Sequence, residues 1–308
     1  MNRLTGRARP ANTPRMDDAA PLAEAWIEQP APFRLVRPAA PATPLICASP
    51  HSGRIYPAAM LAASQLDRRA IRRSEDALVD QLIAGAPAHG HTLIAAEFAR
   101  AYIDVNREPW ELDPAMFEDE LPSFARARTA RVAAGLGAIA RIVCEGQEIY
   151  ARKLTFAEAE SRVRQVHQPY HAALAALVGE MKARLGLAIL IDWHSMPAAA
   201  ALGRGGEACD IVLGDRFGAA CSPHVTAFVE RTLGSLGYRV ARNAPYAGGY
   251  TTEHYGRPGR KIHALQVELS RALYFDEAEL APTAGFEQLG ADLARLFAAL
   301  AAQDWGGL

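Results

Sequence analysis

The segment Ala-Ile-Leu-Ile-Asp-Trp-His-Ser, residues 188–195, decides the fold class. Its first part, Ala188–Ile191, is wholly apolar and lacks the alternation of a strand with one wet face, which is typical of a strand buried on both faces. Short apolar runs recur at Leu45–Ala48, Thr92–Ala96, Ala101–Val105, Asp210–Leu213, Tyr238–Ala241 and Ala264–Leu269. Strands of this kind occur in sheets that are covered by helices on both sides, so the pattern indicates an α/β protein.

Helical segments alternate with these runs. They are expected at Ser74–Ala86, Thr129–Arg152, Thr155–Leu185 with an interruption at Pro169, Ser222–Leu236 and Phe286–Ala302. Ser74 is a candidate N-cap, and Pro223 occupies a first helical position. Strands that alternate with helices predict an α/β sandwich with a mostly parallel sheet.

Length and composition indicate a globular chain. Of the 308 residues, 50% are hydrophobic and 22% are charged, which is far from the composition of a disordered chain. Residues 1–28 are rich in Pro and Ala without a period, so we expect a mobile lead-in there. The remainder, residues 29–308, is expected to form a single domain.

Charge and cysteine content argue against several classes of function. The 33 Lys and Arg residues nearly balance the 34 Asp and Glu residues, which leaves no bulk positive field for nucleic acid or anionic lipid. The four cysteines form no CxxC pair, which favours a reducing compartment. No secretory signal and no run of roughly 18 apolar residues is present. We therefore expect a soluble, cytoplasmic protein that binds neither nucleic acid nor membranes.

Polar side chains follow several predicted strands at their carboxyl ends, where open α/β sheets bind ligands. His51 follows the first run, and His194 follows Ala188–Ile191. Two imidazoles and one carboxylate are a typical ligand set for a catalytic zinc ion, with a fourth position left for water. Asp76 or Glu75, at the start of the next predicted helix, would supply the carboxylate. Either acid could instead complement the helix dipole.

Two further groups of residues fit a hydrolytic site. The guanidinium of Arg107, in the run Asp104-Val105-Asn106-Arg107, could bind a substrate carboxylate bidentately or pair with Asp104. Glu268 lies in an otherwise apolar run, so its burial requires either a partner such as Arg271 or a role as an acid or base.

Other polar segments carry weaker signals. The Gly-rich loop 243–256, which contains Tyr250 and His254, is typical of a binding loop or lid. His171 lies in a helical stretch after Pro169, where it would orient a substrate or, as we favour, mark a kink. The serines that adjoin His51 and His194 lie outside any GxSxG motif, which disfavours a Ser-His-Asp hydrolase.

Eight motifs, taken in order, resemble those of the N-formylglutamate amidohydrolase family. They are Ser49-Pro50-His51-Ser52-Gly53 with Tyr56-Pro57, Glu75-Asp76, Arg100 with Tyr102-Ile103-Asp104-Val105-Asn106-Arg107, Pro169-Tyr170-His171, Asp192-Trp193-His194-Ser195, Gly248-Gly249-Tyr250, His254-Tyr255-Gly256 and Gln266-Val267-Glu268-Leu269-Ser270-Arg271. The resemblance covers about residues 44–275. One such motif is a weak signal, whereas eight in sequence are specific.

The resemblance implies a phosphorylase/hydrolase-like α/β/α sandwich, similar to zinc carboxypeptidases and aspartoacylases, and hence a single metallohydrolase domain. By this analogy His51, Asp76 and His194 bind Zn²⁺, and Glu268 acts as general base. The analogy also makes Arg107 a catalytic and substrate-binding residue, and it extends substrate binding to Asn106, Asp104, Tyr250, His254, His171 and Arg271. The carboxypeptidase pattern needs an acid where this chain has Arg54, so the choice between Asp76 and Glu75 stays open.

The activity that the resemblance implies is metal-dependent hydrolysis of an N-acyl amino acid. The implied substrate is N-formyl-L-glutamate, cleaved to formate and L-glutamate in histidine degradation. Two alternatives remain, namely a deacylase for a different N-acyl amino acid and a non-catalytic relative that binds carboxylates. The sequence does not indicate the oligomeric state.

Overall fold

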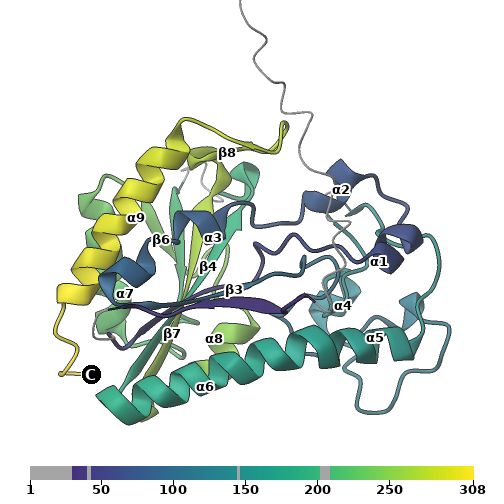
Figure 1. Ribbon diagram of the computed structural model, residues 1–308, viewed down its shortest axis with the longest axis horizontal. Helices are drawn as coiled ribbons and strands as arrows, with labels where there is room; N and C mark the ends of the chain where they lie inside the picture. The colour runs from purple at the N-terminus through teal and green to yellow at the C-terminus, as the bar shows by residue number, and fades with distance from the viewer. Residues whose placement is uncertain (1–29, 40–42, 144–145, 202–208) are drawn as a thin grey trace, which may run out of the picture. The chain divides into compact units, whose positions relative to one another are not determined.

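A seven-stranded sheet runs through the computed structural model (Figure 1). Its strands, in spatial order, are β1 (Phe33–Val36), β3 (Thr92–Ala96), β2 (Leu45–Ser49), β4 (Ala188–Met196), β7 (Ile262–Ser270), β5 (Ile211–Gly214) and β6 (Val240–Arg242). Four neighbouring pairs are parallel, whereas β1 pairs with β3 and β5 pairs with β7 in antiparallel fashion. The sheet is therefore mixed and mostly parallel, as the sequence predicts.

The structure describes residues 30–39, 43–143, 146–201 and 209–308. The expected lead-in over residues 1–28 lies outside these ranges. Residues Ala31–Leu308 form one compact unit. Within the described ranges, we find no helix with the length and apolar character needed to cross a membrane.

Helices cover both faces of the sheet, which gives three layers (Figure 1). On one face, α3 (Val79–Leu82), α7 (Pro223–Ser235) and α9 (Gly285–Ala302) share a core with Ile191 and Trp193. On the other face, α6 (Gln168–Leu185) and α8 (Tyr250–Tyr255) pack with Leu190. Alternate residues of β4 thus enter opposite cores, which explains its unbroken apolar sequence and confirms the α/β/α sandwich.

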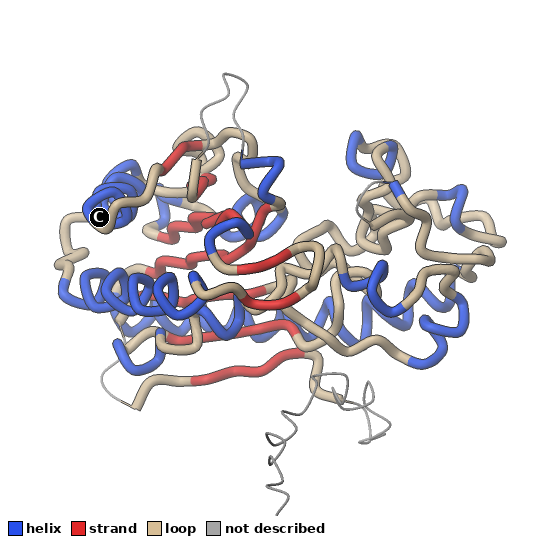
Figure 2. The backbone as a smooth tube through the Cα atoms, turned by 90° about the horizontal axis from the view of Figure 1, so that it is seen from above, coloured by secondary structure: helices blue, strands red, loops and turns tan. Residues whose placement is uncertain are grey.

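A loop-rich lobe, defined as residues 54–73, 97–143 and 146–155, extends beyond the carboxyl ends of β2 and β3. Figure 2 shows the strands gathered in one part of the unit and mostly loops and short helices in the other. The helices of the lobe are α1 (Ala58–Ala63), α2 (Arg68–Arg72), η3 (Pro114–Met116) and α4 (Ala130–Ala133). Arg162 of α5 (Phe156–Arg162) fastens the lobe, because its buried guanidinium donates to the Tyr102 carbonyl at 3.0 Å and the Tyr150 hydroxyl at 2.6 Å.

Three predicted elements are wrong. The run Ala101–Val105 forms turns, not a strand, and its Ile103 and Val105 side chains are apolar because they pack into the core beside α6. Of the expected helix Ser74–Ala86 only α3 and η2 (Ala86–His89) exist, because Leu78 adopts a left-handed φ of 62°; Ser74 caps nothing. Among the described residues of the expected helix Thr129–Arg152, the only α-helix is α4, since Gly135 has a φ of 78°.

Other predicted elements are confirmed. Helix α7 begins after Ser222, whose hydroxyl accepts a hydrogen bond from the His224 amide. The expected interruption at Pro169 is a π-helical turn, η5 (Val163–His167), between α5 and α6. Proline lacks the N–H that a regular helix would use at this point. The short edge strand β1 and the hairpin of β8 (Phe275–Asp276) and β9 (Ala281–Pro282) were not expected. The remaining single turns are η6 (Ala198–Ala201), η7 (Pro258–Arg260) and η8 (Arg271–Leu273).

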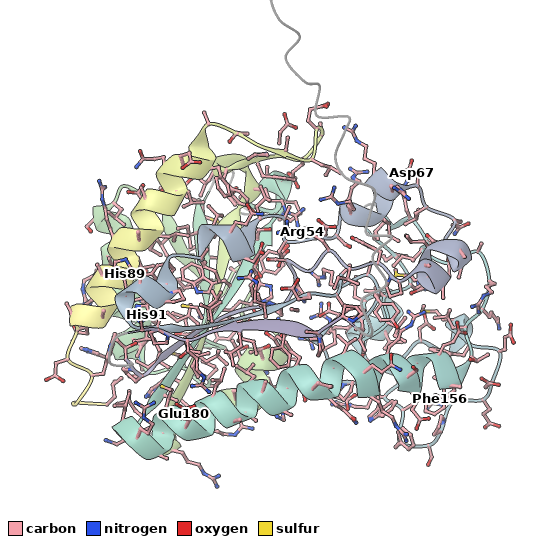
Figure 3. All side chains as sticks on the ribbon, in the orientation of Figure 1. Arg54, Asp67, His89, His91, Phe156 and Glu180 are labelled. Atoms are coloured by element: carbon pink, nitrogen blue, oxygen red, sulfur yellow. The ribbon has the colours of Figure 1, made fainter. Side chains whose placement is uncertain are left out.

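One buried histidine lies in the core, remote from the strand ends that carry the polar motifs. His91, just before β3, lies below α9 (Figure 3). Its Nε2 lies 3.0 Å from the Phe297 carbonyl, and its Nδ1 lies 2.7 Å from the Thr43 hydroxyl. Burial lowers the pKa of His91 to about 4.

Candidate active site

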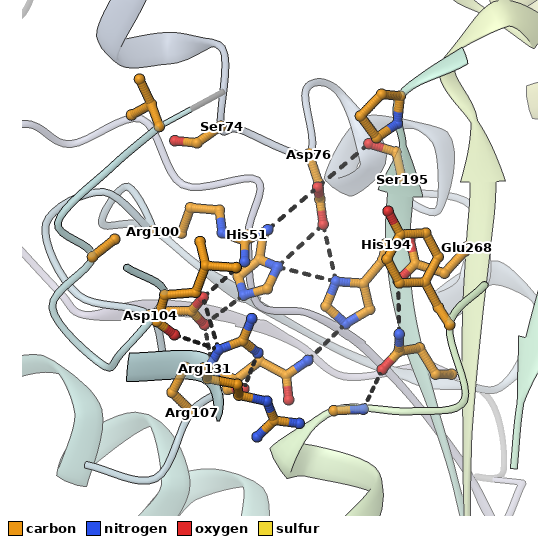
Figure 4. A pocket seen from close by; sticks show the side chains of 18 of the residues that line it. His51, Ser74, Asp76, Arg100, Asp104, Arg107, Arg131, His194, Ser195 and Glu268 are labelled. Atoms are coloured by element: carbon orange, nitrogen blue, oxygen red, sulfur yellow. Dashed lines mark hydrogen bonds and ion pairs between the residues drawn. The ribbon is translucent and has the colours of Figure 1, made fainter. Parts of the chain in front are cut away.

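Three of the predicted site residues converge at the carboxyl end of the sheet (Figure 4). His51 follows β2, Asp76 precedes α3 and His194 belongs to β4. The His194 Nδ1 lies 3.0 Å from the His51 Nδ1 and 2.9 Å from Asp76 Oδ2, and the His51 Nδ1 lies 3.2 Å from that oxygen. All three side chains are buried. Their ligand atoms form a compact triangle that could hold a metal ion.

Local contacts bring the loop after β2 to the segment before α3. The amide of Asp76 donates to the His51 carbonyl at 3.0 Å, and the Ser52 hydroxyl donates to the Asp76 carbonyl at 3.1 Å. Gly53 permits the close approach of the loop-rich lobe, because a Cβ at this position would lie 2.2 Å from the Phe98 carbonyl oxygen. A larger residue would displace the loop that carries His51.

The Nε2 atom of each imidazole, which is not part of the triangle, faces a carboxylate. The His51 Nε2 lies 2.7 Å from Asp104 Oδ1, and the His194 Nε2 lies 3.0 Å from Asp192 Oδ2. Because an ionised carboxylate only accepts, both Nε2 atoms carry the proton and both Nδ1 atoms present lone pairs. Metal-binding histidines are commonly held in this way.

The triangle fits a small divalent cation. Two lone pairs and a carboxylate oxygen at about 3 Å repel one another unless a cation or proton lies between them. Ligand atoms of a tetrahedral zinc site lie about 3.3 Å apart, close to the 2.9–3.2 Å seen between His51, Asp76 and His194.

Electrostatics differ sharply between the two acids of the site. Burial opposes ionisation of Asp76, but the adjoining imidazoles of His194 and His51 hold its pKa well below the usual range. Burial raises the pKa of Glu268. Two carboxyl groups in such different environments suit different roles, one as a permanent anion and one as a group that exchanges a proton.

Asp76, not Glu75, joins the histidines. Glu75 turns away, since its Oε1 accepts from the Tyr56 hydroxyl at 2.7 Å and from Arg72 Nε at 3.1 Å. The two acids adjoin in sequence but contact different partners. The geometry therefore favours Asp76 over Glu75 as the carboxylate that joins the histidines, a choice that the sequence left open.

Glu268 lies beside His194 because the two residues pair in the register of β7 and β4. Its Oε1 accepts from Gln266 Nε2 at 2.7 Å, and the Gln266 Oε1 accepts from the Gly249 amide at 2.7 Å. The alternative pairing of Glu268 with Arg271 is wrong. Arg271 instead donates to the Ser195 hydroxyl, the Glu75 carbonyl and Glu277, at 3.1, 2.8 and 3.2 Å.

Asp104 and Asn106 help to hold the two histidines in place. Besides His51, Asp104 accepts from Arg100 Nη2 and from the Asn106 amide, both at 2.8 Å. The Asn106 Oδ1 accepts from the Thr251 amide at 2.7 Å, and its Nδ2 donates to Asp192 Oδ2 at 3.4 Å, the oxygen that accepts from the His194 Nε2. Both side chains border the cavity, but their polar atoms are committed to protein partners.

Tyr250, His254 and His171 are grouped together but do not line the cavity. The His171 Nε2 donates to the Val105 carbonyl at 2.7 Å, and its Nδ1 lies 2.9 Å from the Tyr255 hydroxyl. His171 thus anchors the turn that carries Asn106. The structure does not bring these three predicted substrate-binding residues to the site.

A cavity of about 480 Å³ opens onto the triangle. Five arginines line it, together with three acids and several apolar residues. The arginines are Arg73, Arg100, Arg107, Arg131 and Arg271, the acids are Asp76, Asp104 and Glu268, and the apolar residues include Ala101, Leu136, Ala140, Ile142 and Val143. Arg107 donates to the Asn106 and Leu136 carbonyls, and its Nε lies 4.0 Å from Asp104. The surplus of positive charge suits an anionic ligand.

Four residues of the site were missed as functional residues. Arg100 donates to Asp104, and Asp192 accepts from His194. Gln266 donates to Glu268, and Gly249 leaves space for the Asn106 side chain. A usable signal existed for two of them. Asp192 and Gln266 lie two positions before His194 and Glu268, and residues at that spacing share one face of a strand.

Comparisons with known proteins agree on one family. The profile of the family described as N-formylglutamate amidohydrolase matches residues 43–275. The chain is 30% identical to N-formylglutamate deformylases from Pseudomonas aeruginosa and Pseudomonas putida, over 76% and 77% of this chain and 83% of each relative. A crystal structure of N-formylglutamate amidohydrolase from Ralstonia eutropha JMP134 has a TM-score of 0.85 and 38% identity, and covers 90% of this chain and 100% of that chain.

Proposed function

Because the chain belongs to the N-formylglutamate amidohydrolase family and is an amide hydrolase, we propose that its substrate is N-formyl-L-glutamate, cleaved to formate and L-glutamate. The observation that carries this proposal is the triangle of His51, Asp76 and His194 beside Glu268 in a cavity rich in arginine. The expectations of a cytoplasmic enzyme of histidine degradation, and of one domain over residues 29–308, belong to the same proposal.

The metal in this proposal is zinc, with His51, Asp76 and His194 as its ligands. When bound, zinc supplies Lewis acidity, which polarises a carbonyl oxygen and lowers the pKa of water. Asp104 and Asp192 fix the orientation and the proton position of the two imidazoles.

Glu268 is the general base of the proposed reaction. Its carboxylate takes one proton from the attacking water as the oxygen bonds to the formyl carbon. The C–N bond then breaks, and Glu268 returns that proton to the departing nitrogen, which gives formic acid and the free amine; transfer of the acid's proton to the amine leaves formate and the ammonium form of the amino acid. Gln266 donates to one oxygen of Glu268 and thereby directs the other.

Arg107 is proposed to bind a carboxylate of the substrate. Its guanidinium is held by two backbone carbonyls, and no carboxylate of the described residues lies within hydrogen-bond distance of it. Burial lowers the pKa of Arg107 despite the attraction of Asp104. An anionic substrate would relieve this cost and would hold the developing charge close to a cation.

The experiment is the release of formate and glutamate by purified, zinc-loaded protein, compared with Glu268→Gln. The variant should retain zinc but lose about 10²–10⁴-fold in kcat, because an amide cannot accept the proton. Glu279→Gln, the same change at an exposed position, is the control.

Three outcomes would contradict the proposal. Near-normal turnover by Glu268→Gln would exclude its role as base. Release of formate only from other N-formyl amino acids would favour a deacylase of different specificity. Binding without turnover would favour a non-catalytic relative that binds carboxylates.

A further inference from the structure

We propose that Arg131 binds the side-chain carboxylate of the substrate and so makes the enzyme selective for acidic N-acyl amino acids. The inference rests on the proposed function, because it concerns the same cavity. It assigns a second cation to the substrate, at a position distinct from that of Arg107.

The guanidinium of Arg131 has N–H donors available to bind a ligand. It lies on α4 of the loop-rich lobe, lines the cavity, and its side chain is 35% exposed. Its one ion pair with a described residue is to Glu111 Oε2 at 3.9 Å, which exceeds hydrogen-bond distance. By contrast, Arg100 and Arg271 are held by Asp104 and Glu277 at 2.8 and 3.2 Å.

The segment that carries Arg131 also supplies the apolar wall of the cavity. Leu136, Ala140, Ile142 and Val143 follow it within one stretch of chain, and the Leu136 amide donates to the Arg131 carbonyl at 2.8 Å. A glutamate side chain is two methylene groups followed by a carboxylate. An apolar wall and a guanidinium supplied by the same segment offer partners for both parts of that side chain.

The positions of the two arginines fit a dicarboxylate whose amide lies at the histidines. In the view of Figure 4, Arg107 and Arg131 lie across the two histidines from Glu268. Arg107 adjoins Asn106, which contacts His194, so it is suited to the carboxylate nearer the scissile amide. Arg131 comes from the lobe and is suited to the carboxylate at the far end of the side chain.

Mutual repulsion of the guanidinium groups gives an independent reason. After burial and Arg100, Arg131 contributes to lowering the pKa of Arg107. Two anionic groups on one ligand would neutralise both cations at once. A ligand with a single carboxylate would leave one guanidinium without an anion inside the cavity.

The test compares two substrates that differ in one charge. Steady-state kinetics are measured with N-formyl-L-glutamate and N-formyl-L-glutamine for the zinc-loaded wild type, Arg131→Gln and Arg131→Lys. For Arg131→Gln, the ratio of kcat/KM for the acid over the amide should fall about 10- to 100-fold, mainly through KM for the acid. Arg131→Lys should retain part of the preference, because it keeps the charge but not the planar fork.

Arg152→Gln removes an exposed arginine of the same lobe that does not line the cavity, and its ratio should equal that of the wild type. Equal losses for both substrates in Arg131→Gln, with formate still released by the wild type, would overturn the inference and leave the proposed function standing. An unchanged ratio would overturn it as well. A wild type that releases formate from neither substrate would overturn the proposed function, and the inference with it.

Discussion

Replacement of Gly249 by alanine tests how tightly the loop before α8 positions the histidines. Gly249 has a φ of −92°, a value that alanine adopts without strain, so any effect must arise from the added methyl group. A Cβ at this position would lie 2.5 Å from Asn106 Nδ2 and 2.8 Å from Asn106 Oδ1. The side chain that it meets joins Thr251 to Asp192, the partner of His194.

The magnitude follows from these distances. Ordinary contacts to a Cβ begin at 3.4 Å, so the Asn106 amide must move by about 0.9 Å. Such a shift breaks the 2.7 Å hydrogen bond from the Thr251 amide and withdraws Asn106 from Asp192, the carboxylate that holds His194. Overpacking of this kind lowers the free energy of unfolding by about 1–3 kcal/mol. Loss of a group that orients a metal ligand lowers metal affinity or activity about 10- to 100-fold.

The assays are urea unfolding, zinc competition with a chelator, and kcat. Gly179→Ala is the matched control, since a Cβ there meets nothing within 4 Å and Gly179 lies inside α6. That variant should gain up to about 1 kcal/mol in stability and keep its activity. Wild-type stability, zinc affinity and kcat in Gly249→Ala would refute the argument that Asn106 helps to position His194 through Asp192.

Three further predictions concern the metal, the base and the core. Asp76→Asn should lose most of the bound zinc, whereas Glu75→Gln should retain it, as measured by elemental analysis of dialysed protein; the reverse result would exclude Asp76 as the ligand. Gln266→Leu should lower kcat about 10-fold with little change in KM, because Glu268 loses the donor that orients it; an unchanged kcat would contradict this role. The unfolded chain protonates His91 below about pH 6.5 and the folded chain only below about 4, so the free energy of unfolding should fall by roughly 2 kcal/mol between pH 7 and 5. His91→Gln should remove that part of the pH dependence in urea titrations, and an identical pH dependence in this variant would contradict it.

The positions of the candidate ligands could be predicted because side chains alternate between the two faces of a strand at a fixed spacing. His194 lies on the same face of β4 as Leu190, four residues earlier, and parallel strands bring their carboxyl ends to one edge. The same logic failed at residues 101–105. There the apolar side chains reflect burial in the core, and an apolar pattern does not distinguish a buried turn from a buried strand.

Helix boundaries failed for a different physical reason. Gly135 and Gly146, with φ values of 78° and 76°, are visible in the sequence as helix breakers, so the over-long helix at 129–152 was avoidable. The left-handed φ of Leu78 was not, because leucine favours helices. Tertiary contacts that the sequence pattern does not show hold the segment just before Leu78, including the hydrogen bond from the Asp76 amide to the His51 carbonyl.

The roles of the individual polar residues depend on contacts between segments far apart in the chain. The periodicity of the sequence does not predict these contacts. Asp104 and Asn106 were expected to bind substrate, yet their polar atoms hold His51 and the Thr251 amide. A count of hydrogen-bonding groups would have anticipated part of this. Each histidine that offers one nitrogen to a metal has a second, protonated nitrogen, which needs an acceptor once it is buried. Two buried histidines therefore require two acceptors beyond the ligand carboxylate, and Asp104 and Asp192 were the acids at the neighbouring strand ends and turns still available for that role.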